Sequence, residues 1–181
     1  MLILIGAGGI LLVSISRASL EMMSKEEREG KLRTEAVVID GVEIYKLPQS
    51  WVLLDNKYYW LKEIRDWTWQ KFSFGEENKI QLALILADKK IAEARVLWQK
   101  EKYDLAIKSY ERAIEKLKYA NKLVDKIENK DIIKNQFTEQ IRKMTEVYRK
   151  MIEEMGKNDK IDEQKYLLLE KEINEFEKNQ I

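Results

Sequence analysis

The sequence predicts a mainly α-helical fold, a bundle of about five helices with a small β-hairpin, preceded by an N-terminal hydrophobic helix. Three observations support this prediction. The 181-residue chain has one proline and is rich in Lys, Glu, Leu and Ile, which suit long helices with charged surfaces. Apolar residues recur at helical spacing through its second half. Near residue 40, an Asp-Gly pair between β-branched residues is typical of a hairpin turn.

Composition narrows the classes of function. Lys and Arg number 33 and Asp and Glu 32, so the chain lacks the basic excess typical of nucleic-acid-binding proteins. Histidine and cysteine are absent, which removes thiol chemistry and the usual zinc ligands and histidine bases. We therefore expect a protein that is not an enzyme, with no cofactor, no metal and no nucleic-acid partner.

The first segment, residues 1–20, is expected to be a membrane anchor in contact with lipid. Residues 1–16 carry no charge. As a helix they reach about 24 Å, short of a hydrocarbon core of about 30 Å, but Ala18 to Leu20 can extend the helix while Arg17 reaches the interface. A signal peptide cleaved near Ala18 and a buried element of a soluble domain are the alternatives.

A glycine cluster in the same segment suggests a nucleotide-binding loop, the least favoured alternative. Gly6, Gly8 and Gly9 follow an apolar run, but Leu11 stands where the dinucleotide fingerprint requires its third glycine. No second parallel-strand pattern follows. We therefore do not expect a nucleotide-binding enzyme.

We interpret residues 21–33 as a charged linker and residues 34–48 as the hairpin. The two-residue turn at Asp40-Gly41 sets the register, and Pro48 is expected to stop the pairing. The expected cross-strand pairs are Ile39 with Val42, Val37 with Ile44, and Glu35 with Lys46 as an opposite-charge pair.

Residues 49–128 are expected to form a helical domain with three helices. The first begins after a cap near Asp55 or Asn56, and the third begins at an Asp104 cap. The expected ranges are about 57–72, 76–100 and 104–128.

Residues 129–181 are expected to form a C-terminal helical hairpin or coiled coil. Its helices cover about 131–155, ended by Gly156, and about 160–179. Their apolar stripes resemble coiled-coil seams but are short. Packing within the chain is the favoured interpretation, and binding to a protein partner or self-association is the alternative.

Aromatic residues are concentrated in and just before the predicted helix at about residues 57–72. Four of the five tryptophans lie between residues 51 and 69. Trp60, Ile64 and Trp67 share one helical face, which we interpret as core. Other aromatic side chains point elsewhere, and basic residues lie nearby, as in helices at a membrane interface. The candidate membrane-interface or partner contacts are therefore Trp51, Tyr58 and Trp69.

Residues 87–120 resemble one tetratricopeptide repeat. Tyr103, Ala106, Tyr110 and Ala113 stand where that motif places its packing residues, whereas Glu101 or Lys102 replaces its glycine. No second copy is evident, and a solenoid requires about three. The resemblance implies the packing of one helical hairpin and no peptide-binding array.

A wider stretch, residues 47–127, resembles the bacterial and archaeal domain-of-unknown-function family DUF5667. Its pattern combines a Leu-Pro-x-Ser start, a Tyr-Leu-Lys helix and a Leu- and Ala-rich helix ending in Glu-Ala. Here these are Leu47, Pro48, Ser50, Tyr59, Leu61, Lys62, Leu84, Ala87, Glu93 and Ala94. The resemblance implies an N-terminal signal or anchor and a domain outside the cytoplasm, and it implies no activity.

We therefore expect a membrane-anchored helical protein with a structural or protein-interaction role and an extracytoplasmic helical region. The basic residues after the anchor favour the cytoplasmic face instead, by the positive-inside rule. The alternative locations are the cytoplasmic face of the membrane and secretion after cleavage near Ala18. The alternative function is that of a soluble nucleic-acid-binding helical module.

Overall fold

The computed structural model describes residues 34–39, 42–48, 53–127, 131–158 and 160–179. Within them lie the two strands and five helices of the predicted mainly α fold. The elements are β1 (Thr34–Ile39), β2 (Val42–Pro48), α2 (Tyr59–Phe72), α3 (Glu76–Gln99), α4 (Tyr103–Val124), α5 (Asp131–Gly156) and α6 (Glu163–Lys178). The predicted anchor, its glycine cluster and the linker lie outside the described residues. None of the helices in these ranges combines the length and the hydropathy that a bilayer-spanning segment needs.

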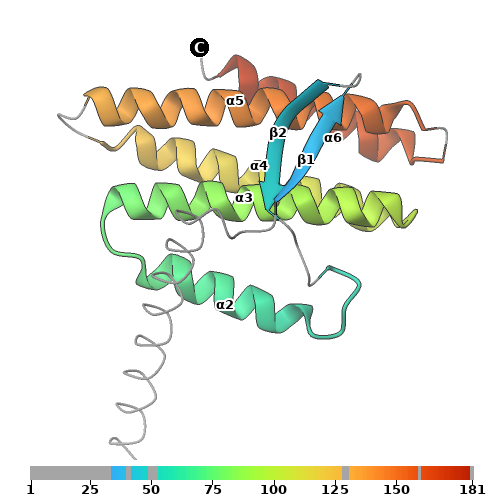
Figure 1. Cartoon of the computed structure of the whole chain (residues 1–181), viewed down its shortest axis with the longest axis horizontal. Coiled ribbons are helices and arrows are strands. Elements are labelled where there is room, and N and C mark those ends of the chain that lie inside the picture. The colour runs from blue at the N-terminus through green and yellow to red at the C-terminus, as the bar shows by residue number, and fades with distance from the viewer. Residues whose placement is uncertain (1–33, 40–41, 49–52, 128–130, 159, 180–181) are drawn as a thin grey trace, which may run out of the picture.

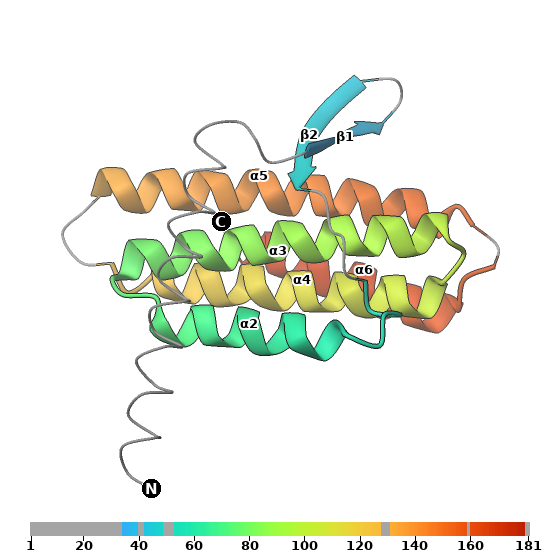
Figure 2. The same cartoon turned by 60° about the horizontal axis from the view of Figure 1, so that its bottom comes forward.

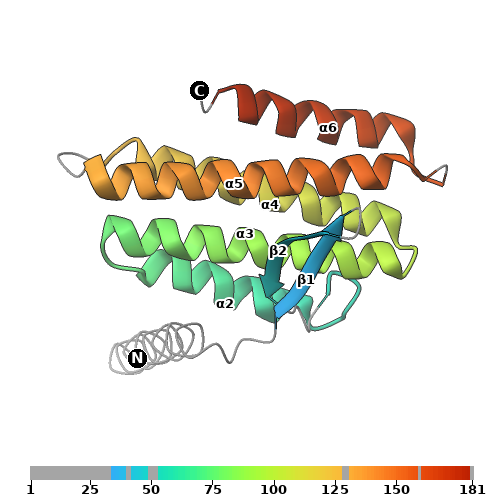
Figure 3. The ribbon, with the colours of Figure 1, turned by 45° about the horizontal axis from the view of Figure 1, so that its top comes forward.

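The helices run side by side in layers (Figures 1 and 2). Figure 3 shows α2 at one side of the stack and α6 at the other, with α3, α4 and α5 between them. The hairpin lies across α3 and α5 (Figure 1). The outermost position of α2 leaves one of its sides without a neighbouring helix among the described elements.

One hydrophobic core joins the strands to α3, α4, α5 and α6. The stripes predicted for the last two helices face inward, as Ile141, Tyr148 and Ile173 are fully buried. The helices on either side of residue 128 therefore share a core. Asp88 of α3 reinforces it, because its carboxylate accepts hydrogen bonds from Tyr148 Oη at 2.8 Å and Tyr45 Oη at 2.9 Å.

The hairpin register differs from the prediction beyond its first pair. Ile39 lies opposite Val42 as expected, but Val37 lies opposite Tyr45, because a β-bulge leaves Ile44 as an extra residue in β2. The bulge turns Leu47 into the core, where it is buried.

The predicted pair of Glu35 with Lys46 is therefore wrong. Glu35 lies opposite Leu47 and forms an ion pair with Arg95 of α3 at 3.5 Å. Lys46 instead lies 3.6 Å from Glu43 on its own strand. The bulge shifts the register by one residue, which separates the two charges that a regular hairpin would have paired.

Two predicted caps are also wrong. The N-cap of α4 is Lys102, and Asp104 lies in the first turn, where it pairs with Lys165 of α6 at 2.7 Å. The N-cap of α2 is Tyr58, although Asn56 Oδ1 accepts a hydrogen bond from the Tyr58 backbone N–H at 2.9 Å. In both cases the side chain that was predicted to cap the helix makes a different contact.

Helix α5 ends at Gly156, as predicted, and the glycine is its last residue. A Cβ at this position would lie 2.4 Å from Cζ of Tyr166, so the glycine allows α6 to approach α5 closely.

The hairpin of α3 and α4 has the packing that the tetratricopeptide resemblance implies. Ala106, Tyr110 and Ala113 are buried, and Tyr103 packs edge-on against Trp98 with ring centroids 4.7 Å apart. This pair of helices forms the centre of the bundle on which α2 rests.

Candidate functional site

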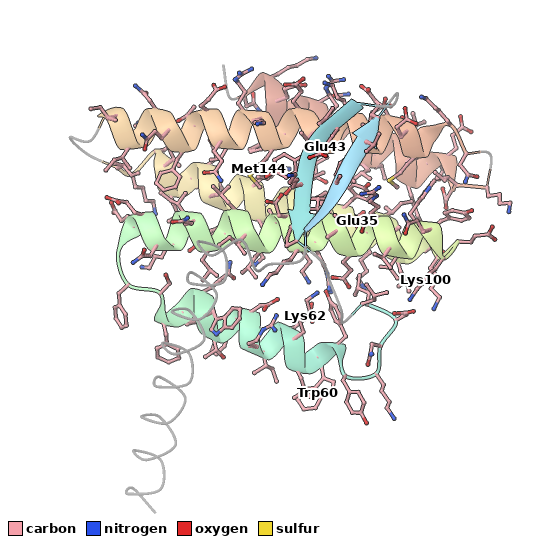
Figure 4. All side chains as sticks on the ribbon, viewed as in Figure 1. Glu35, Glu43, Trp60, Lys62, Lys100 and Met144 are labelled. Atoms are coloured by element: carbon pink, nitrogen blue, oxygen red, sulfur yellow. The ribbon has the colours of Figure 1, made fainter. Side chains whose placement is uncertain are left out.

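Helix α2 has the opposite orientation to the predicted one. Trp60, Ile64 and Trp67, expected in the core, are 56%, 53% and 60% exposed. Tyr59, Lys62 and other polar residues of α2 face the bundle instead. Figure 4 shows Lys62 between α2 and α3, and Trp60 pointing away from the bundle.

A buried ion cluster holds the inner side of α2. We use this name for Tyr59 and Lys62 of α2, Lys90 and Glu93 of α3, and Arg112 of α4. Glu93 Oε2 accepts hydrogen bonds from Lys62 Nζ at 3.1 Å and from Tyr59 Oη at 3.2 Å, and lies 4.0 Å from Lys90 Nζ. The Glu93 side chain is fully buried, so these partners compensate for a carboxylate removed from water.

Tyr59 links all three helices. Its hydroxyl oxygen accepts hydrogen bonds from Lys90 Nζ and, at 3.2 Å, from an Arg112 guanidinium nitrogen. Arg112 also pairs with Glu63 of α2 at 2.6 Å. These contacts fix the rotation of α2 about its own axis, because each requires the inner side of the helix to face α3 and α4.

Burial shifts the protonation equilibria of the cluster. It lowers the pKa of Lys90 to about 8, and the nearby Glu93 carboxylate opposes this change. It raises the pKa of Tyr59, and the charge of Glu93 acts in the same direction. Tyr59 is therefore a neutral phenol at physiological pH and serves as a hydrogen-bonding bridge.

A cavity of about 210 Å³ adjoins the cluster between α2, α3 and α4. Its lining carries both signs of charge, including Asp66, Lys90 and Lys116. Asp66 Oδ2 and Glu93 Oε1 are buried and accept no hydrogen bond from the residues that the structure describes. Among those residues, no group of three or more acidic side chains is placed to hold a metal.

The outer face of α2 is apolar and exposed. We define it as six residues of the helix and its flanks, each between 49% and 71% exposed: Tyr58, Trp60, Leu61, Ile64, Trp67 and Phe74. Ammonium groups lie over two of its rings. Lys57 Nζ is 4.9 Å from the centroid of Tyr58, and Lys71 Nζ is 5.9 Å from that of Trp67.

The three candidate contacts predicted from the sequence have different positions. Tyr58 is exposed and belongs to the outer face. Trp69 is only 5% exposed and packs with Leu82 and Leu86 of α3, so its expected exposure is wrong. Trp51 lies outside the described residues.

The inner side of α2 had a signal in the sequence. Tyr59, Lys62, Asp66 and Trp69 recur at intervals of three and four residues, which is the spacing of one helical side. A helical stripe with two charged residues nevertheless predicts a side that faces solvent, unless the ionic partners of those residues on other helices are known. The fold supplies those partners, and the stripe lies inward.

The ion cluster also explains the family resemblance in spatial terms. Tyr59 and Lys62, which belong to one part of the family pattern, meet Glu93 from a later part, 34 and 31 residues away in sequence. The family model of DUF5667, a domain of unknown function, matches residues 52–181. The chain belongs to this family. The match covers α2 to α6, so the DUF5667 domain includes the two C-terminal helices beyond the predicted limit at residue 127. No curated protein and no solved structure matches the chain.

Proposed function

We propose that this DUF5667 protein is a membrane-anchored helical protein that acts through binding, in a structural or protein-interaction role, and not as an enzyme. The observation that carries the proposal is the outer face of α2, which exposes two tryptophans and two aliphatic side chains side by side. Contiguous apolar patches of this kind mark interaction sites, because exposing them to water costs free energy.

The buried ion cluster supports the same proposal. Turning α2 to hide Trp60 and Trp67 would take Lys62 and Tyr59 away from the buried Glu93 and leave it the longer pair with Lys90 of its own helix. Removing hydrogen-bonded partners from a buried charge is strongly destabilising. The fold therefore maintains the outer face in its exposed orientation, as a binding surface requires.

In this proposal residues 1–20 anchor the chain in the lipid bilayer and hold the helical region outside the cytoplasm. Cell fractionation of the full chain tests the anchor, and we expect it to resist extraction by alkaline carbonate. Protease added from the extracytoplasmic side should digest the helical region in intact cells. Carbonate release of the intact protein would contradict the anchor, and digestion from the cytoplasmic side alone would contradict the placement.

Self-association through the C-terminal helices is a second proposed interaction. Leu167 and Leu168 of α6 are 51% and 67% exposed, next to each other on the layer farthest from α2. Light scattering of the full chain in detergent should give a mass above that of one chain, and the Leu167→Gln/Leu168→Gln variant should lower it to one chain. A monomeric parent chain would rule this interaction out.

A further inference from the structure

We propose that the outer face of α2 lies in the headgroup region of an anionic lipid bilayer. This inference rests on the proposed function, because the anchor is what brings the helical domain to the membrane. It goes further in naming the lipid surface as the occupant of the face and in fixing how the domain lies on it.

The side chains of the outer face suit the headgroup region. Trp60, Trp67 and Tyr58 each combine an apolar ring with a polar N–H or O–H group, and such rings concentrate where hydrocarbon meets water. Leu61 and Ile64 add aliphatic surface between them. Such rings suit both protein interfaces and the headgroup region, so the choice of lipid rests on the charges around the face and on the anchor.

The charges around the face favour anionic lipid. Lys57 and Lys71 lie over rings near its two ends. The two acidic residues of α2 are already neutralised, because Glu63 pairs with Arg112 at 2.6 Å and Asp66 with Arg65 at 2.7 Å. The edge formed by α2 is therefore basic, whereas Glu76 and Glu77 follow Phe74 at the start of α3.

The position of α2 allows the whole face to reach a flat surface. The helix is the outermost layer and runs alongside α3 (Figures 1 and 3). Docking would thus lay the helix axes along the bilayer, with α5 and α6 away from it. Residues 21–33, which separate the anchor from the domain, can span up to about 45 Å, so the anchor permits this arrangement.

The absence of cysteine makes a direct test simple. A nitroxide spin label is attached to Ile64→Cys on the outer face and, as the matched control, to Ile132→Cys on α5, which is 76% exposed. Both full-length chains are reconstituted in vesicles of equal parts phosphatidylcholine and phosphatidylglycerol. Accessibility is measured to oxygen, which concentrates in lipid, and to a water-soluble nickel chelate.

We expect the label at residue 64 to be accessible to oxygen and shielded from nickel, and the label at residue 132 to show the reverse. The Lys57→Gln/Lys71→Gln variant should shift the docking equilibrium of the residue 64 label towards water by about 30-fold, since each ammonium near an anionic surface contributes about fivefold. In vesicles of phosphatidylcholine alone, this variant and the parent should behave alike.

The outcomes separate this inference from the proposed function. Chains that resist carbonate extraction but show equal nickel access at residues 64 and 132 would overturn the docking and leave the anchor intact. Shielding of residue 64 from oxygen and nickel together would show that protein, from this chain or another copy, covers the face, which also overturns the inference. An unchanged equilibrium in the lysine variant would overturn the anionic preference.

Discussion

At the residue scale, Glu101 has a backbone conformation that glycine adopts more readily. Its φ is +56°, in the left-handed region. The Glu101 N–H donates to the Trp98 carbonyl at 2.9 Å and the Lys102 N–H to the Leu97 carbonyl at 2.9 Å, which together form a Schellman motif at the end of α3. Glu101 thus occupies the turn position that the tetratricopeptide motif gives to glycine.

Replacing this residue should stabilise the protein. Glu101→Gly removes the left-handed strain of about 1 kcal/mol, and the lost ion pair with Lys160 is exposed and weak. Urea unfolding should show a gain of up to about 1 kcal/mol. The neighbouring Lys100→Gly, at a φ of −88°, should give no gain, and equal effects of the two variants would refute the explanation.

Glu93 is the charge on which the buried ion cluster depends. Glu93→Gln keeps the shape but leaves the Lys62 and Lys90 ammonium groups without their shared anion. We expect a loss of about 3–5 kcal/mol in the free energy of unfolding. Glu63→Gln, which breaks an exposed pair with Arg112, should cost about 1 kcal/mol or less. Similar losses in the two variants would show that the cluster has no special role.

The lowered pKa of Lys90 predicts a pH dependence of stability. Burial lowers this pKa from 10.5 to about 8, while Glu93 opposes the change and Lys62 and Arg112 add to it. Between these two pH values the unfolded chain binds more protons than the folded chain, so the free energy of unfolding rises with pH.

Lys90 should contribute a rise of about 2 kcal/mol from pH 8 to pH 10, measured by urea unfolding as the difference between the parent chain and Lys90→Met. From about pH 9 the raised pKa values of Tyr59, Tyr110 and Tyr148 oppose this rise, because the tyrosines of the unfolded chain ionise first. The Lys90→Met variant should lose most of the rise. A rise of the same size in that variant would assign it to other groups, such as Lys116, whose pKa burial also lowers.

At the scale of the element, α2 places two tryptophans two residues apart in opposite environments. Trp67 belongs to the outer face and Trp69 packs on α3. The charges of the inner side decide this arrangement, since pairing Lys62 with Glu93 requires that side to face inward.

The two tryptophans form a matched pair of tests in detergent solution. Trp69→Ala should lower the free energy of unfolding by about 3–5 kcal/mol, because it leaves a cavity against Leu82 and Leu86. Trp67→Ala should change it by less than about 0.5 kcal/mol, as for other surface substitutions. A large loss for Trp67→Ala would mean that other protein covers the outer face.

At the scale of the whole molecule, one core joins the hairpin to α3, α4, α5 and α6, so we expect these elements to unfold together. Removing residues 129–181 would uncover the parts of α4 that contact α5 and α6 and would remove the Tyr148 partner of Asp88. We expect the shortened chain to lack a cooperative thermal transition, followed by circular dichroism. The full chain should show one transition by circular dichroism and tryptophan fluorescence alike. A cooperative transition in residues 1–128 would instead establish a separate domain.

The sequence by itself determined the helices and the family. Helix positions follow from local apolar spacing, as the inward stripe from Ile141 to Met155 shows, and the DUF5667 resemblance followed from residues such as Tyr59, Lys62 and Glu93. These features are local patterns along the chain, so they can be read without tertiary contacts.

Only the tertiary structure decided which side of α2 faces inward and what lies opposite each hairpin residue. Tyr59 and Lys62 become an inner side only because Lys90, Glu93 and Arg112 come to meet them from two other helices. The bulge at Ile44 likewise depends on β2 placing Leu47 into the core. The physical reason is that a buried charge requires partners, and partners about 30 to 50 residues away in sequence are brought together only by the fold.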